Sequence, residues 1–400
     1  MKPIYFDNNA TTACDPAVVE AMLPFFTEQF GNPSSMHQFG SSVAGAMARA
    51  RSEVQQLLGA AHDSEIVFTS CATESNNTAI LSALKVQGGR REIITSAVEH
   101  PAVLSLCKHL AEQEGYVLHI LPVDGKGRLN LEHYQSLLSD STALVSIMWA
   151  NNETGTLFPV LEMAAMAHRV GALFHTDAVQ AAGKTPIDLK NSAIDMLSLS
   201  GHKLHAPKGV GALYLRRGMR FRPLLRGGHQ ERGRRAGTEN VAGIVGLGEA
   251  ARLAREHMGE ESTRVKALRD RLEAGVLAAV PYAFVTGDVD KRLPNTANIA
   301  FEYIEGEAIL LLLNEAGIAA SSGSACTSGS LEPSHVMRAM GIPYTAAHGT
   351  IRFSLSRYTT AAEVEHVIET LPGIVARLRK LSPYWGEAGP AQQAFEPAYA

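Results

Sequence analysis

The sequence predicts an α/β fold in which a mostly parallel sheet is covered by helices on both faces and is joined to a smaller α+β C-terminal domain. Short β-rich runs alternate with helical periodicity between about residues 40 and 215, as expected when each crossover between parallel strands is a helix. A chain of 400 residues also exceeds what one hydrophobic core usually serves, so we expect two domains.

The first strong helical pattern ends at Gly59. Apolar residues recur before it at steps of four and three, which marks one buried helix face; they are Val43, Met47, Ala50, Val54 and Leu57. Seven candidate strands follow, which predicts a seven-stranded sheet: 65–68, 92–95, 117–121, 143–148, 172–175, 196–199 and 211–215. Helical stretches separate most of them, at 74–85, 102–114, 131–138 and 160–170.

The second half of the chain follows a Gly/Arg-rich stretch at residues 226–237. A long helical segment at about 239–274 should bridge to the small domain, where we expect strands at 297–301 and 350–355 and a helix at 307–316. The residues after 385 have no apolar period, which predicts a poorly ordered tail. The limits that we assign are 16–261 for the large domain, 1–15 with 262–385 for the small domain, and 386–400 for the tail.

Composition and charge exclude several classes of partner. A formal net charge of −4 leaves no global basic field, so we expect neither nucleic acid nor an anionic membrane as a partner. A secretory signal requires an apolar run of about 7–15 residues, and the N-terminal residues contain none. The longest apolar run, 308–313, is too short to cross a bilayer. We expect a cytoplasmic protein.

The chain has four cysteines, Cys14, Cys71, Cys107 and Cys326, and none of them forms a CxxC pair. They are too few for a disulfide framework or a structural zinc site. Cys326 lies in the segment 321–330, SSGSACTSGS, which offers no apolar side chain to bury a thiol. We expect a mobile loop that carries the thiol between a buried site and the surface, the alternative being an incidental loop cysteine. We assign no chemistry to the other three.

Polar residues that follow the predicted strands have the most functional weight, because ligands bind at the carboxyl ends of parallel strands. A helix start near Thr73, after a small-residue turn, would hold a phosphate with its N–H groups; the alternative is that Ser70 or Thr73 only caps that helix. His100 follows the next strand, where an imidazole stacks on an aromatic cofactor or moves a proton, or else only caps a helix.

Three further strand ends carry candidate residues. Asn152 would donate to a carboxylate or only shape a turn. Asp177 requires a cationic partner such as a protonated pyridine nitrogen unless it is an N-cap, and Gln180 follows three residues later. The nearby GKT is not a P-loop, since Ala178 stands where the first glycine is required. Lys203, in a basic glycine-containing turn, suits Schiff-base chemistry, whereas the alternative is a surface lysine.

Ten ordered motifs across residues 4–385 resemble those of one family. They are DNNATT, GNPSSMH, ATE, EHPAV, NNETG, HTDAVQ, SGHK, RRAGTEN, GSACTSG and GTIRFSLSR. They closely resemble the cysteine desulfurases, class-V enzymes of fold-type I that depend on pyridoxal 5'-phosphate (PLP). The SSGSACTSG motif resembles that of the long-loop group of desulfurases. The longer stretches of sequence around the motifs are most similar to the NifS-like desulfurases of nitrogen-fixing bacteria.

The resemblance implies a role for each matching residue. Lys203 would bind PLP covalently, Asp177 would face the pyridinium nitrogen, Gln180 would bond the ring hydroxyl and His100 would stack on the ring. The phosphate would be held by Ala72, Thr73, Ser200, Gly201, His202 and, from the second subunit of a homodimer, Thr238. Asn152 would lie near cofactor and substrate, and Arg352 would pair with the substrate carboxylate.

The implied reaction removes sulfur from L-cysteine and leaves L-alanine. Lys203 would be the base for the Cα proton, and His100 would take part in later proton transfers. Cys326 would receive the sulfur as a persulfide and pass it to an iron–sulfur scaffold or another acceptor protein, for nitrogenase maturation. Iron would meet Cys326 only through that persulfide, at an iron–sulfur cluster. The alternatives are a housekeeping IscS-type desulfurase, a selenocysteine lyase or aminotransferase on this fold, and a non-catalytic sulfur carrier.

Overall fold

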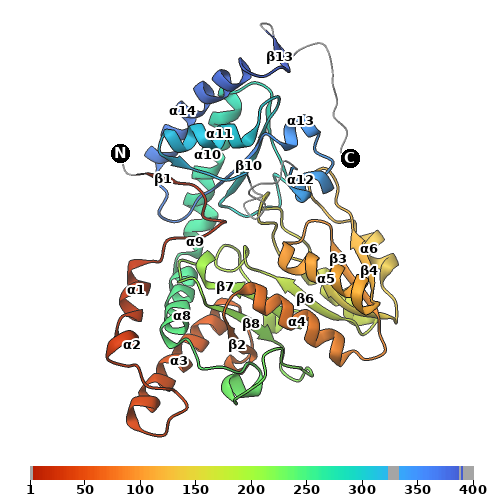
Figure 1. The fold of residues 1–400 in the computed structure, drawn as a ribbon, viewed down its shortest axis with the longest axis vertical. Helices are drawn as coiled ribbons and strands as arrows, with labels where there is room; N and C mark the ends of the chain where they lie inside the picture. The colour runs from red at the N-terminus through yellow and green to blue at the C-terminus, as the bar shows by residue number, and fades with distance from the viewer. Residues whose placement is uncertain (1–2, 323–332, 387–388, 391–400) are drawn as a thin grey trace.

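The computed structural model describes residues 3–322, 333–386 and 389–390. Its main feature is a seven-stranded sheet with the order β2-β8-β7-β6-β5-β3-β4, in which only β8 runs against its neighbours (Figure 1). The strands are β2 (Ile66–Thr69), β3 (Glu92–Ser96), β4 (Val117–Leu121), β5 (Thr142–Ser146), β6 (Leu173–Asp177), β7 (Met196–Ser200) and β8 (Gly211–Leu215). All seven predicted strands are present in it, so the predicted fold class is confirmed.

Helices cover both faces of this sheet. Residues of β2, β5, β7 and β8 are buried throughout, as expected for strands that are covered by helices on both faces. On one face the core includes side chains of α4 (Ala72–Val86) and α5 (Pro101–Glu114). On the other face the core includes α3 (Gln38–Leu57), α6 (Leu131–Leu137), α7 (Val160–Arg169) and α8 (Val241–Glu256).

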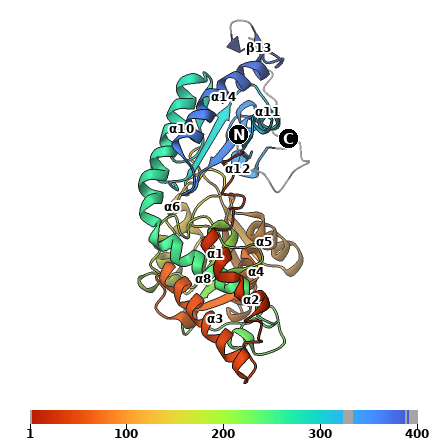
Figure 2. The same ribbon diagram turned by 90° about the vertical axis from the view of Figure 1, so that its left-hand side faces the viewer.

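The long helical segment predicted at 239–274 is interrupted in the structure. After α8 come α9 (Met258–Glu260), one π-helical turn (Glu261–Val265) and α10 (Lys266–Ala279). Figure 2 shows α8 in the part of the molecule that holds the large sheet and α10 in the other part. This segment therefore connects the two parts, as the sequence predicts, although not as one uniform helix.

The second part has its own sheet and core. Its antiparallel strands have the order β12-β10-β9, and helices α10, α11 and α14 pack on them. Elements not yet given are α1 (Pro16–Met22), α2 (Pro24–Thr27), β9 (Ala283–Val285), β10 (Thr296–Phe301), α11 (Gly306–Glu315), α12 (His335–Ala339), α13 (Tyr344–Ala347), β12 (Thr350–Ser354) and α14 (Ala361–Arg379). The predicted elements at 297–301, 307–316 and 350–355 are thus present, and α14 was not predicted.

Segments near the beginning and the end of the described residues both form short strand pairs. Strand β1 (Ile4–Tyr5) pairs in parallel with β11 (Ile318–Ala319). Within the predicted tail, β13 (Trp385–Gly386) pairs with β14 (Gly389–Pro390), while residues 387–388 and 391–400 lie outside the described residues. The assigned domain limits and the disorder of that tail remain predictions. In the portion of the chain that the structure describes, no helix is long and apolar enough to span a bilayer.

Helices α3 and α8 meet through small residues. A Cβ at Gly248 of α8 would lie 2.4 Å from Cα of Ala50 on α3, so only glycine permits this approach. We therefore expect Gly248→Ala to lower the free energy of unfolding by about 1–3 kcal/mol, because the helices must separate. Thermal unfolding measures this effect.

The matched control is Gly373→Ala on α14, where nothing lies within 4 Å of the added methyl group. Alanine there should stabilise the protein by roughly 0.5–1 kcal/mol, because it restricts the unfolded chain and favours helix. Equal effects of the two substitutions would contradict the close packing of α3 on α8.

Candidate active site

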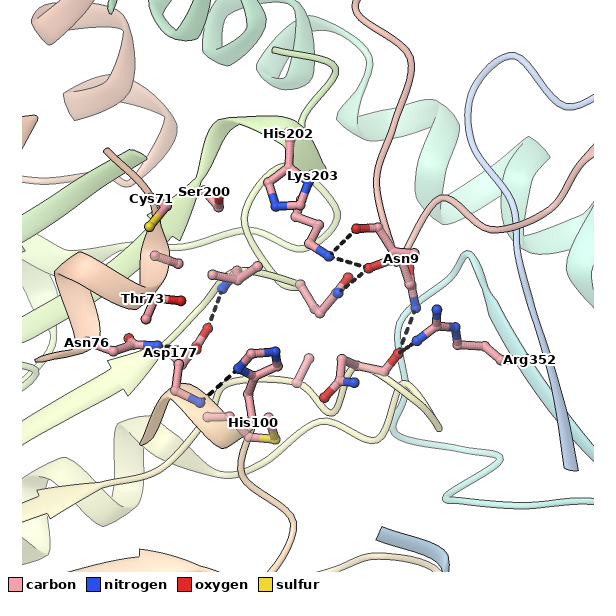
Figure 3. Close-up of a pocket in the computed structure, with 18 residues that line it drawn as sticks. Asn9, Cys71, Thr73, Asn76, His100, Asp177, Ser200, His202, Lys203 and Arg352 are labelled. Carbon is pink, nitrogen blue, oxygen red and sulfur yellow. Dashed lines mark hydrogen bonds between the residues drawn. The ribbon is translucent and has the colours of Figure 1, made fainter. Parts of the chain in front are cut away.

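A cavity of about 280 Å³ lies at the carboxyl ends of the central strands, between the two parts of the molecule (Figure 3). Ten of the predicted site residues line it: Ala72, Thr73, His100, Asn152, Asp177, Gln180, Ser200, His202, Lys203 and Arg352. Gly201 and Thr238 do not line it, and Cys326 lies outside the described residues. The strand-end rule thus brings together side chains that are up to 280 positions apart in the sequence, from Ala72 to Arg352.

Lys203 follows β7 and points into this cavity. Its Nζ donates hydrogen bonds to the carbonyl oxygens of Asn9 at 2.5 Å and Ala10 at 2.7 Å. Burial, followed by the positive charges of Arg352 and Lys184, lowers the pKa of Lys203 to about 7. A large fraction of this amine is therefore neutral near pH 7, which is the form that attacks a carbonyl carbon or accepts a proton. The surface-lysine alternative is wrong.

Asp177 ends β6 and is buried. Its Oδ2 accepts from Nδ2 of Asn76 at 2.7 Å, and its Oδ1 accepts from the backbone N–H of Val179 at 3.0 Å. The contact with Val179 is the local turn bond that the N-cap alternative implied. The carboxylate still lines the cavity, so lone pairs remain to accept from a protonated ring nitrogen.

His100 serves two purposes at once. It is the N-cap of α5, where its Nδ1 accepts from the N–H of Ala102 at 3.1 Å, and it also lines the cavity. Burial, followed by the charges of Lys203 and His335, lowers its pKa, while Asp177 acts in the opposite direction. The imidazole is therefore neutral at pH 7, with Nδ1 as acceptor and Nε2 as the protonated nitrogen.

The start of α4 presents unpaired backbone N–H groups. The helix begins after Cys71, and no side chain within the described ranges caps it. Ser70 instead donates from its hydroxyl and its N–H to the carboxylate of Glu74, at 2.5 and 2.8 Å, so the idea that Ser70 or Thr73 only caps the helix is wrong. With Ala72 and Thr73 at the cavity wall, this helix start is suited to an anion.

The turn after β7 contributes less to an anion site than the sequence implied. Ser200 and His202 line the cavity, and burial lowers the pKa of His202 to about 4, so its ring is neutral at pH 7. Gly201, however, donates its N–H to the carbonyl of Val210 at 2.9 Å, and a Cβ on it would lie 2.9 Å from the Val210 side chain. Gly201 thus serves close packing in this chain. Thr238 is exposed and lies away from the cavity.

Arg352 lies on β12 and closes the opposite wall of the cavity, with only 2% of its surface exposed. Its Nη2 pairs with Oδ1 of Asp7 at 2.8 Å, and its Nη1 donates to the backbone carbonyl of Asn152 at 2.9 Å. Its buried Nε has no hydrogen-bond partner among the residues described. The guanidinium group is held in place but not saturated, which suits it to bind a carboxylate.

Two asparagines that we did not single out complete the wall. Asn9 lies in the DNNATT motif, and its Nδ2 donates to Oγ1 of Thr296 at 2.9 Å, which ties the N-terminal segment to β10. Asn76 lies on α4, one turn after Ala72, and its buried Oδ1 has no partner within the part of the chain described. Its spacing of four residues from the helix start was the available signal. Cys71, to which we assigned no chemistry, also lines the cavity.

Together these groups define the ligand chemistry. The start of α4 suits a phosphate, Asp177 suits a protonated ring nitrogen, and the amine of Lys203 suits a carbonyl carbon. Arg352, on the other side of the cavity, suits the carboxylate of a second molecule. The residues present therefore fit a phosphorylated pyridine aldehyde together with an amino acid.

Comparisons with known proteins agree with this chemistry. The family model for class-V aminotransferases matches residues 4–367. The cysteine desulfurase NifS of Azotobacter vinelandii is 72% identical over the full length of both chains, and a cysteine desulfurase of Gluconacetobacter diazotrophicus is 67% identical over the same extent.

Solved structures give the same result. A NifS-like protein superposes with a TM-score of 0.88 at 40% identity, over 94% of this chain and 100% of its own. The protein SspA, solved in complex with cysteine, superposes with a TM-score of 0.78 at 37% identity, over 89% of this chain and 100% of its own. Members of the matched family depend on PLP. This chain therefore belongs to the class-V aminotransferase family, among its cysteine desulfurases.

Proposed function

We propose that this chain binds PLP at Lys203, takes sulfur from L-cysteine and carries it as a persulfide on Cys326. The observation that supports this most strongly is the amine of Lys203, which has a pKa of about 7 and lies in the same cavity as Arg352. One group is suited to hold the cofactor, and the other is suited to hold the carboxylate of an amino acid.

The cofactor would be held by groups whose hydrogen-bonding capacity is incompletely used. The N–H groups at Ala72 and Thr73, with Ser200 and His202 nearby, would bind its phosphate, and Thr238 would be supplied by the partner subunit. Asp177 would bond the ring nitrogen, Gln180 the ring hydroxyl, and His100 would pack on the ring. When bound, PLP withdraws electrons from the substrate Cα and so eases loss of its proton.

The protein residues then bind the substrate and move its protons. Arg352 binds the carboxylate of L-cysteine, with Asn152 beside it. The neutral amine of Lys203 accepts the Cα proton, and its position in the cavity allows it to return a proton later. His100 is neutral and lines the same space, which suits it to relay protons during the later steps.

Sulfur transfer requires the thiolate of Cys326 to form an S–S bond as the Cβ–S bond of the substrate breaks. One L-cysteine and one thiol give one L-alanine and one persulfide, so no external oxidant is needed. Ser321 supports this role, because its N–H donates to the carbonyl of Arg352 at 3.2 Å and its carbonyl accepts from the Arg352 N–H at 2.6 Å. Cys326 is five positions after Ser321 in the sequence, a span of at most about 18 Å.

The acceptor of the sulfur would be an iron–sulfur scaffold or another protein, and a cluster would meet Cys326 only through the persulfide. The name of the relative at 72% identity supports a role in nitrogenase maturation, with general cluster supply as the alternative. We also infer that the protein acts in the cytoplasm. An aminotransferase function is disfavoured, because transamination does not need the thiol of Cys326.

An exposed apolar surface supports the homodimer. We call it the N-terminal patch; it consists of Leu23, Phe26, Phe30, Met36 and Phe39, each at least 59% exposed. The rings of Phe30 and Phe39 lie 5.9 Å apart, so these two side chains form a contiguous apolar surface. Contiguous exposed apolar surface is typical of a protein interface.

Cys326→Ala tests the sulfur acceptor. We expect this variant to bind PLP normally but to lose nearly all formation of alanine from L-cysteine, because no thiol receives the sulfur. Alanine and sulfide are measured directly, and Cys14→Ala, which does not line the cavity, is the control expected to retain activity. Normal alanine formation by Cys326→Ala would remove Cys326 from the mechanism.

Arg352→Lys tests recognition of the substrate carboxylate. Lysine keeps the charge but cannot make two parallel hydrogen bonds, so kcat/KM for L-cysteine should fall by about 10- to 100-fold, mainly through KM. The control is Arg271→Lys, at an exposed ion pair with Glu365 on the surface. An unchanged KM in Arg352→Lys would assign the carboxylate to another group.

A double substitution, Phe26→Asp with Phe30→Asp, tests the N-terminal patch. Two charges at the centre of an apolar interface should convert the dimer into monomers, which light scattering after size-exclusion chromatography detects. Leu311→Asp is the control, because Leu311 is equally exposed at 67% but lies on α11 in the other part of the molecule. A dimer that survives the double substitution places the interface elsewhere.

A further inference from the structure

A second lysine, Lys184, is buried directly behind the cavity. Only 8% of its surface is exposed, and its Nζ donates to both the backbone carbonyl and the side-chain Oε1 of Gln180, each at 3.3 Å. The two residues are four positions apart in a helical turn after β6, which places them on one face. Burial of an ammonium group is costly, so this arrangement calls for a physical reason.

Hydrogen bonds connect Lys184 to Lys203 through two residues. Gln180 donates from its Nε2 to the carbonyl oxygen of Asn9 at 2.9 Å, and the same oxygen accepts from Nζ of Lys203. An ammonium group can only donate, so its contact requires Oε1 of Gln180 to face Lys184. The amide therefore has one allowed orientation, with its N–H donors turned towards Asn9 and the cavity.

The backbone brings the two lysines close together. Gly183 has a φ of +75°, and a Cβ on it would lie 2.6 Å from Cδ2 of Leu204, the residue after Lys203. A further cavity of about 20 Å³ is lined by both lysines. The turn that carries Lys184 thus packs against the segment that carries Lys203.

The charges around the pair favour one cation over two. Lys203 faces the cations Arg352 and Lys184 and the carboxylates of Asp7 and Asp177. Lys184 faces Glu261, in the π-helical turn between the two parts, and Arg352. Burial lowers the pKa of Lys184 to about 8, so most Lys184 side chains are protonated at pH 7. Their positive charge disfavours protonation of Lys203.

We propose that Lys184 is a positioning residue for Lys203: it fixes the orientation of the Gln180 amide and, as a buried cation, disfavours a second positive charge on the neighbouring amine. The proposal rests on the proposed function of Lys203 as the residue that binds the cofactor. It assigns the buried lysine of the GKT sequence to the control of the amine rather than to a nucleotide.

The test measures the protonation of Lys203 in the apoenzyme, without any desulfurase reaction. The protein is labelled briefly with acetic anhydride between pH 5 and 10, at intervals of about one unit, to cover both pKa values, and acetylation of the peptide that contains Lys203 is quantified by mass spectrometry. In the wild type, labelling should rise with a midpoint near 7, because only the neutral amine reacts.

Lys184→Met removes the charge, so the midpoint for Lys203 should move upward by about one unit. Lys184→Arg keeps a donor-only cation and should retain the low midpoint, which a purely structural role of the lysine stem would not predict. Lys190→Met, at an exposed lysine six positions later, is the control for removal of a positive charge.

An unchanged midpoint in folded Lys184→Met overturns the proposal, as does a raised midpoint in folded Lys184→Arg. If Lys184→Met does not fold, Lys184→Gln keeps a polar contact with Gln180 without the charge and must show the same upward shift. Alanine formation from L-cysteine is measured separately. If the wild type forms no alanine from L-cysteine, the proposed function is refuted, but the comparison of the labelling midpoints remains valid.

Discussion

The amine of Lys203 and the backbone carbonyls of Asn9 and Ala10 form the contact on which the site depends. Lys203 comes from the large sheet, whereas Asn9 is fixed to the second part through Thr296 and through its N–H, which donates to Oγ of Ser354 at 2.9 Å. Burial of a lysine requires this closure, because an amine left without acceptors in a dry cavity would be strongly unfavourable. The same closure lowers its proton affinity, so the fold and the reactivity of the amine have one cause.

Positive charge is concentrated at the cavity, which suits it to bind negatively charged ligands. Arg352 lies at its wall and Lys184 behind it, and both are cations near the partly neutral amine of Lys203, whereas Asp177 and Asp7 are the carboxylates that face Lys203. Repulsion among the cations weakens as soon as a phosphate and a carboxylate bind. Part of the binding free energy of such anions would therefore come from relief of repulsion that is already present in the folded protein.

Much of the fold could be predicted from the sequence because its signals are local. Strands β4 and β8 have the predicted limits, since their apolar runs end at turn residues. Helix α14 was missed although Thr360 and Glu363 form a capping box at its start. β6 extends to Asp177, beyond the predicted end at 175, because Thr176 and Asp177 still pair with β7.

The site residues could be predicted where a strand end marks them, but their partners could not. Gly201 is in the predicted turn, yet its N–H is used by Val210, which only the pairing of β7 with β8 determines. The links of Lys203 to Asn9 and of Arg352 to Asp7 cross 194 and 345 positions. No local pattern carries such information, because it arises from the packing of the two parts against each other.

Arg352 connects two steps of the proposed reaction through its backbone and its side chain. The side chain faces the cavity, where a substrate carboxylate would exchange for Asp7, while its N–H and carbonyl pair with Ser321 at the start of the segment that leads to Cys326. A side chain that shifts to meet a carboxylate must remain on a backbone that is fully paired in β12 and with Ser321. The backbone of Arg352 therefore ties the residue that would recognise the amino acid to Ser321, after which the segment with Cys326 begins.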